Sequence, residues 1–210
     1  MQPAVRLVAF DLDNTLYDEG VYFAGAFKVI VPRLAAKSGW NPAWIEERLH
    51  ATLGEKGRHY HYLFNDVLAA IGLDPQADLA DVLDLFRTVE PPIEPFPGTR
   101  DLLADLRCRY RLGMITSGMQ QVQENKIKLL DIAGYFEEIV YSSTLPENKP
   151  GRLPFQRLLG SLGVAAAAAV YVGDNPLFDF KGANEIGMLT VRVRNPEFDT
   201  TDVPPECDGR

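Results

Sequence analysis

The segment VRLVAFDLDNT, residues 5–15, places a run of apolar residues directly before two aspartates, Asp11 and Asp13. A short apolar run that stops at a charged residue is typical of a strand buried in a parallel sheet, with the charge at the strand's carboxyl end. The D-x-D pattern alone is ambiguous, because aspartate and asparagine also form ordinary turns. Its meaning depends on the residues at the ends of the other strands.

Similar apolar runs recur later in the chain and alternate with amphipathic segments. The expected strands are 111–116, 168–173 and 188–193, with a weaker one at 138–141. The expected helices are 99–109, 119–132, 154–162 and 176–186. This alternation predicts an α/β fold in which a Rossmann-like parallel sheet has helices on both faces.

Residues 17–90 interrupt the alternation, because only helices are expected there. They are 21–38, 42–53, 59–71 and 79–89. The proline-rich stretch PPIEPFPG, residues 91–98, ends this interval, since its four prolines oppose regular structure. We therefore expect a core domain formed by residues 1–16 and 91–210, and an inserted α-helical domain at 17–90. The polar residues 196–210 are expected to form an irregular tail.

The composition narrows the class of protein. Twenty-one Lys and Arg against twenty-nine Asp and Glu leave a net charge of −8, which argues against a nucleic acid polymer as partner. The two cysteines have no metal-like spacing and suggest no disulfide framework. No apolar run reaches the length of a membrane span, and no cleavable leader is evident at the N-terminus. We therefore expect a cytoplasmic protein without a membrane partner.

Polar residues follow four of the five predicted strands, at the edge where an open parallel sheet places its ligand crevice. They are Asp11 and Asp13, then Thr116, Ser117 and Gly118, then Lys149, and finally Asp174 and Asp179. Each cluster alone has an ordinary explanation as a turn, a helix cap or a surface lysine. Brought together, four carboxylates would repel one another unless Lys149 and a cation compensated. Oxygen donors without histidine or cysteine favour Mg²⁺ over zinc.

In this order, the four clusters resemble the four motifs of the haloacid dehalogenase superfamily of hydrolases. The segment DFKGANEIGM, residues 179–188, is also similar to the run that comes after the fourth motif in that family. The insert at 17–90 resembles the α-helical cap of the superfamily's phosphatase-like subfamily I. The resemblance covers the whole chain and implies a monomer or a homodimer.

The resemblance also implies a role for each motif residue. Asp11 is expected to be the nucleophile, and Asp13 the general acid and base. Asp11, Asp174 and the backbone carbonyl of Asp13 would bind the metal, and Asp179 would orient bound water or Lys149. Thr116, the amides of Ser117 and Gly118, and Lys149 would bind the phosphoryl group. Tyr22 and Arg58 in the cap are further candidates for contact with the substrate.

The function implied is a Mg²⁺-dependent phosphatase that forms an aspartyl-phosphate from a small metabolite, either a nucleotide, as for a 5′-nucleotidase, or a sugar phosphate. A phosphomutase and a binding protein without turnover remain alternatives. A dehalogenase is disfavoured, because dehalogenases of this superfamily lack the second aspartate and this chain has Asp13.

Overall fold

A parallel five-stranded sheet forms the centre of the computed structural model, which describes residues 4–194. The strand order is β3-β2-β1-β4-β5. The strands are β1 (Leu7–Phe10), β2 (Arg111–Thr116), β3 (Glu138–Tyr141), β4 (Ala169–Gly173) and β5 (Leu189–Arg192). All five expected strands are therefore present, and the α/β fold class is confirmed. The tail expected at 196–210 lies outside the described residues.

The register of the sheet explains where the polar clusters meet. Phe10, the last residue of β1, lies opposite Met114 of β2 and Val172 of β4. β1 therefore lies between β2 and β4, and the connections that leave these strands run to opposite sides of the sheet's centre. In open parallel sheets, this change of direction opens a crevice at the carboxyl ends of the strands. Asp11, the residue after Phe10, is fixed at this edge because its backbone N–H donates to the Val172 carbonyl over 2.8 Å.

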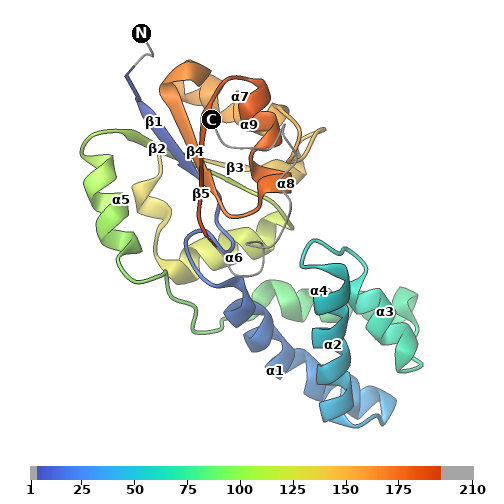
Figure 1. Ribbon diagram of the computed structural model, residues 1–210. Coiled ribbons are helices and arrows are strands. Elements are labelled where there is room, and N and C mark those ends of the chain that lie inside the picture. Colours follow the sequence, from blue (N-terminus) through green and yellow to red (C-terminus); the bar gives the residue numbers. More distant parts are fainter. Residues whose placement is uncertain (1–3, 195–210) are drawn as a thin grey trace. The chain divides into compact units, whose positions relative to one another are not determined.

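Helices cover both faces of the sheet (Figure 1), α5 and α6 on one face and α7, α8 and α9 on the other. Their bounds are α5 (Thr99–Arg107), α6 (Gln120–Leu130), α7 (Leu153–Leu162), α8 (Pro176–Asp179) and α9 (Lys181–Glu185). The apolar cluster under α7 joins Leu7 and Ala9 of β1 to Phe155 and Leu158. Gly113 of β2 permits the close approach of α7, since a Cβ there would lie 2.8 Å from Leu158 Cδ1.

Two expectations about the core helices need correction. The helix expected at 176–186 is split into α8 and α9, because Phe180 turns into the core with φ −101° and leaves ideal helical geometry. The helix expected at 154–162 is α7, which begins one residue earlier, at Leu153. Short 3-10 turns lie between other elements, at Ala133–Tyr135, Ser142–Thr144 and Ala166–Ala168.

The chain divides into two compact units, one formed by the residues up to Glu19 and from Ile93 on, and the other by Gly20–Pro92. These boundaries lie two or three residues beyond those expected at 17 and 90. Tyr17 is the physical reason at the first one: it is buried in the core unit and forms isolated bridges with Asp13 and Pro95.

The inserted unit is helical, as its sequence predicts. It contains α1 (Glu19–Ser38), α2 (Pro42–Lys56), α3 (Leu63–Ala70) and α4 (Pro75–Thr88). Asn41 and Asp74 cap α2 and α4 by accepting a backbone N–H, and a proline comes directly after each cap. Phe23 and Phe64 pack against Phe86 at ring distances of 5.5 and 5.3 Å. Across residues 4–194, no helix combines the length and apolarity that a membrane crossing requires.

Candidate active site

Asp11 lies buried at the end of β1, in a turn that the sequence DNT shapes. Asn14 has φ 57°, a left-handed conformation that asparagine tolerates better than most residues. The Asn14 Oδ1 atom accepts the backbone N–H of Glu19 over 3.1 Å. This turn brings the chain back from the sheet edge and leaves the Asp11 carboxylate at the carboxyl end of β1.

Lys149 lies between two carboxylates at the same edge of the sheet. Its ammonium donates to Asp11 Oδ1 at 2.5 Å, to Asp179 Oδ1 at 2.8 Å and to the Tyr171 hydroxyl at 3.1 Å. Burial alone would lower the pKa of Lys149, but Asp11 and Asp179 outweigh it and raise that pKa well above its usual value. Lys149 therefore stays protonated and carries a positive charge.

Asp11, Asp174 and Asp179 form a buried acidic cluster in which one oxygen of each lies within 4.8 Å of the others. Burial raises the pKa of Asp11 to about 8, and the neighbouring carboxylates add to this effect. Burial, with Asp11 and Asp179, raises the pKa of Asp174 to about 9. Ionisation of this cluster is therefore unfavourable in the protein alone, and a divalent cation would favour the ionised form. Its oxygen donors suit a hard cation such as Mg²⁺.

The position of Asp179 in this cluster depends on a glycine. A Cβ at position 173 would lie 2.4 Å from Asp179 Oδ2, so only glycine leaves room for the carboxylate. The same oxygen accepts the backbone N–H of Asn175 over 2.9 Å. The end of β4 and the start of α8 thus hold Asp179 toward Lys149.

The Asp13 carboxylate faces a different set of partners. It accepts hydrogen bonds from the Tyr17 hydroxyl at 2.6 Å, from Gln123 Nε2 at 2.7 Å and from Lys126 Nζ at 2.7 Å. Burial alone would raise the pKa of Asp13, but the Lys126 charge and these hydrogen bonds hold it below its usual value. The structure thus gives the two aspartates of the DLD segment opposite electrostatic environments.

Thr116 ends β2 with its side chain buried near Asp13. Its Oγ1 atom accepts a hydrogen bond from Gln123, so the hydroxyl proton stays available for a phosphoryl oxygen. The Ser117 hydroxyl pairs with that of Ser142 at 2.9 Å, which leaves the backbone amide as the group that Ser117 offers. Gly118, with φ 102°, completes the turn, and α6 begins two residues later at Gln120.

The structure separates the two cap candidates. Tyr22 is fully buried within the inserted unit, where its hydroxyl donates to the Phe86 carbonyl over 2.8 Å and its ring packs on Phe86. These contacts give Tyr22 a packing role in the inserted unit, and its substrate contact stays a prediction. Arg58 is half-buried in the segment between α2 and α3, and its substrate contact stays a prediction.

Three residues near these motifs escaped prediction: Gln123, Lys126 and Tyr171. Gln123 and Lys126 were expected only as part of a helix, yet they are buried alongside Ile127 and Leu130. Polar residues at helix positions that should face the core are the pattern that would have revealed them. No sequence pattern marks Tyr171 as a site residue, since tyrosine is common in a buried strand.

Comparison with known proteins agrees with this geometry. Residues 8–193 match the family described as haloacid dehalogenase-like hydrolase. The protein belongs to this family. The matched range includes every motif residue discussed above, so the expected family is confirmed.

Curated relatives within the haloacid dehalogenase-like hydrolases are named phosphatases. Glyceraldehyde 3-phosphate phosphatase of Methanopyrus kandleri is 33% identical over 97% of this chain and 89% of its own length. Phosphoglycolate phosphatase of Yersinia pseudotuberculosis is 30% identical over 82% of this chain and 74% of its own length. These relatives bear out the expected enzyme class, a hydrolase of the phosphatase type.

A solved structure of the same family carries a different activity. The 2-haloacid dehalogenase from Pseudomonas syringae pv. Tomato is 29% identical, with a TM-score of 0.65, and the match covers 90% of this chain and 86% of that chain. The family fold therefore hosts both reactions, and the site residues must distinguish them.

Proposed function

We propose that this protein is a Mg²⁺-dependent phosphatase that hydrolyses a small phosphorylated metabolite through an aspartyl-phosphate on Asp11. One observation carries the proposal: Asp11 lies buried in contact with Lys149 and in one acidic cluster with Asp174 and Asp179. This arrangement provides a nucleophile, a fixed positive charge and a set of cation ligands within one crevice.

Asp11 must be a carboxylate to attack, yet its pKa is raised to about 8 in the protein alone. Mg²⁺ bound by Asp11, Asp174 and the Asp13 carbonyl would supply the positive charge that favours the ionised form and neutralises phosphoryl oxygens. Asp179 would hold Lys149 in place from the side opposite Asp11.

The reaction has two steps, in which Asp13 exchanges one proton. Asp13 must enter the first step protonated, so the bound substrate has to raise the pKa that is lowered in the protein alone. A carboxylate oxygen of Asp11 forms a bond to phosphorus as the bond to the leaving oxygen breaks, and Asp13 gives that oxygen its proton. Asp13 then takes a proton from water, whose oxygen attacks phosphorus and releases Asp11 and inorganic phosphate. Thr116 and Lys149 donate hydrogen bonds to the phosphoryl oxygens in both steps.

Asp13 favours phosphate transfer over dehalogenation. An alkoxide leaving group requires a proton, whereas a halide leaves without one, so a hydrogen-bonded carboxylate two residues after the nucleophile serves only the first reaction. The named substrates of the relatives, a triose phosphate and phosphoglycolate, favour small phosphorylated sugars and acids over nucleotides. The cytoplasmic location and the monomeric or dimeric state stay predictions.

The test is release of inorganic phosphate with Mg²⁺ from glyceraldehyde 3-phosphate, phosphoglycolate, hexose phosphates and nucleoside monophosphates, with halide release from a 2-chloro acid as a separate arm. Asp11→Asn is expected to abolish release, because an amide oxygen is a poor nucleophile. Asp101→Asn, at an exposed position on α5, is the matched control and should retain activity.

Each arm of this experiment bears on a different part of the proposal. Equal phosphate release by Asp11→Asn would overturn the aspartyl-phosphate. Activity that persists in excess EDTA would remove Mg²⁺ from the mechanism. Halide release without phosphate release would replace the phosphatase with a dehalogenase.

A further inference from the structure

One face of α6 carries two buried polar side chains that both reach Asp13. Lys126 Nζ lies 2.7 Å from Asp13 Oδ1, and Gln123 Nε2 lies 2.7 Å from Asp13 Oδ2. Gln123 and Lys126 are three residues apart, so they project from the same side of the helix. Each carboxylate oxygen therefore has its own donor, and the plane of the carboxylate is fixed by two separate contacts.

The Lys126 side chain is more deeply buried than that of Asp13. The Lys126 side chain is 3% exposed, whereas the Asp13 side chain retains 20% of its exposure. The Lys126 ammonium is therefore shielded from direct contact with a substrate. Any effect of Lys126 on the reaction must pass through Asp13.

A buried ammonium is costly unless it is paired, and Lys126 is paired twice. Besides Asp13, its ammonium lies 3.0 Å from Glu19 Oε1. Glu19 begins α1 immediately beyond the turn that carries Asp13, and Tyr17 of this turn donates to the Oδ1 atom that Lys126 also contacts. The pairing thus joins α6 to the segment that presents Asp13.

Gln123 links two motifs through a single amide group. Its Nε2 atom donates to Asp13 Oδ2 and also to Thr116 Oγ1, which uses both amide hydrogens. The position of the acid and base group is thereby tied to the hydroxyl that is expected to hold the phosphoryl group.

We propose that Gln123 and Lys126 are positioning residues that hold the Asp13 carboxylate in line with the leaving-group oxygen and the attacking water. This inference rests on the proposed function and names residues beyond the four motifs. An aspartate side chain rotates about two bonds, and an error of about 1 Å in a reacting group can cost about a hundredfold in rate. Two buried donors on one rigid helix remove that freedom.

The experiment compares two substrates that differ in their need for a proton. The nitrophenolate of 4-nitrophenyl phosphate departs without one, whereas the phenolate of phenyl phosphate is more basic and depends on the acid. The quantity measured is the ratio of kcat/KM for 4-nitrophenyl phosphate to kcat/KM for phenyl phosphate. Unfolded or inactive protein lowers both values equally, so a purely structural defect leaves the ratio unchanged.

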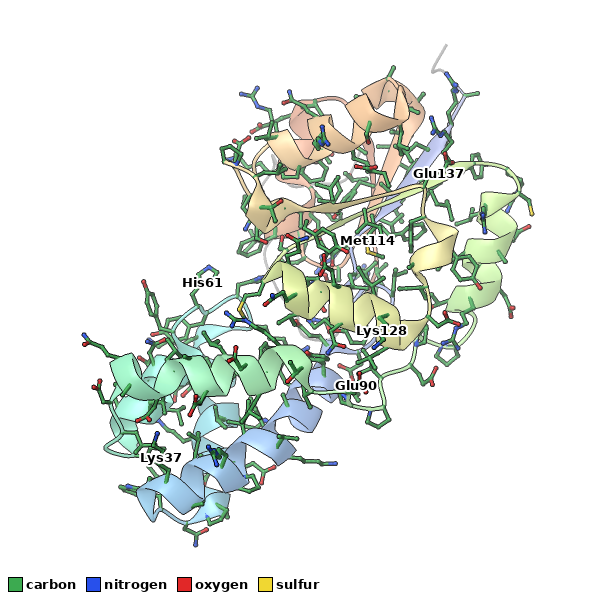
Figure 2. The ribbon with its side chains drawn as sticks, turned by 180° about the vertical axis from the view of Figure 1, so that it is seen from behind. Lys37, His61, Glu90, Met114, Lys128 and Glu137 are labelled. Atoms are coloured by element: carbon green, nitrogen blue, oxygen red, sulfur yellow. The ribbon has the colours of Figure 1, made fainter. Side chains whose placement is uncertain are left out.

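Lys126→Met and Gln123→Met are expected to raise this ratio by about tenfold or more, toward the value of Asp13→Asn. Lys128→Met, on the exposed surface of the same helix (Figure 2), is the matched control and should leave the ratio unchanged. In an Asp13→Asn background, Lys126→Met should cause no further change, because both substitutions remove the same function. Gln123→Met, which leaves no buried charge unpaired in the helix, tests the proposal if Lys126→Met does not fold.

Two results would overturn the inference and leave the proposed function intact. An equal loss with both substrates would show that Gln123 and Lys126 act only on folding. An additional change of the ratio in the Asp13→Asn background would show that they act elsewhere. Failure of the wild-type protein to release phosphate in an Asp11-dependent manner would overturn the proposed function, and the positioning role with it.

Discussion

Tyr171 shows how a single hydroxyl supports the site at the residue scale. It donates to the Ile115 carbonyl over 3.1 Å and lies 3.1 Å from Lys149 Nζ, while its ring packs edge-on against Phe155 at 5.0 Å. The hydroxyl therefore connects β2 and β4 to the lysine that faces the nucleophile. The Tyr171 ring packs in the apolar core, and its hydroxyl oxygen contacts Lys149 in the site.

We predict that Tyr171→Phe lowers kcat about tenfold while the protein remains folded. The substitution keeps the ring but leaves a buried carbonyl and an ammonium each without one partner, at a cost of about 1–3 kcal/mol. Steady-state kinetics and a thermal melt would measure both effects. Tyr135→Phe, in the 3-10 turn after α6, is the control. An unchanged kcat would show that Asp11 and Asp179 hold Lys149 without help.

The site residues that can be predicted from the sequence differ in position from those that cannot. Asp11 and Asp174 are visible because a charge ends an apolar run, and a parallel sheet collects strand ends at one edge. Gln123 and Lys126 lie mid-helix, where their burial depends on a carboxylate more than a hundred residues away in the chain. Sequence alone states their type and periodicity, but only the fold brings them to Asp13.

At the scale of elements, the capping residues at helix ends are predicted better from the sequence than the continuity of a helix along its length. Asn41 and Asp74, each with a proline directly after it, mark the starts of α2 and α4. The expected start at 79 overlooked the second of these caps and was four residues too late. The break between α8 and α9 depends instead on Phe180 packing into the core, which no local pattern indicates. Tertiary packing thus overrides helix continuity there.

The close packing of helix α1 against Pro91 is expected to require a glycine at position 25. A Cβ at Gly25 would lie 2.3 Å from Pro91 Cβ, and the rigid proline ring cannot move away as a flexible side chain would. We predict that Gly25→Ala destabilises the protein by about 1–3 kcal/mol, measured by denaturant unfolding.

Gly54→Ala on α2 is the matched control, because an added Cβ there meets no heavy atom within 4 Å. It should stabilise the protein by about 0.5–1 kcal/mol through helix propensity alone. Similar gains from both substitutions would show that the Pro91 contact relaxes at little cost.

At the scale of the whole molecule, the charge of −8 and the buried acidic cluster act in the same direction. Both disfavour the folded state as carboxyl groups ionise, and both favour the binding of a cation. The core unit therefore carries an electrostatic cost at the place where the proposed reaction needs Mg²⁺. Stability and metal binding are linked through the protonation of the same groups.

We predict that the gain in Tm produced by Mg²⁺ grows as the pH rises from about 5 to about 9. The pKa values of Asp11 and Asp174, raised from 3.8 to about 8 and about 9, mean that the folded protein holds protons that the unfolded chain has released. Without a cation, stability therefore falls with rising pH between the unfolded and folded pKa values. A bound cation replaces those protons, so its benefit is largest where they are lost.

The other shifted groups of the site do not alter this sign. Lys126 and Lys149 have pKa values raised above 10.5, so both remain protonated in the folded and unfolded states throughout the range. The lowered pKa of Asp13 affects stability only below about pH 4. Melting curves in EDTA and in Mg²⁺ at each pH would measure the effect, and Asp174→Asn should flatten its dependence on pH. A gain in Tm that stays constant from pH 5 to pH 9 would place the cation outside the cluster of Asp11, Asp174 and Asp179.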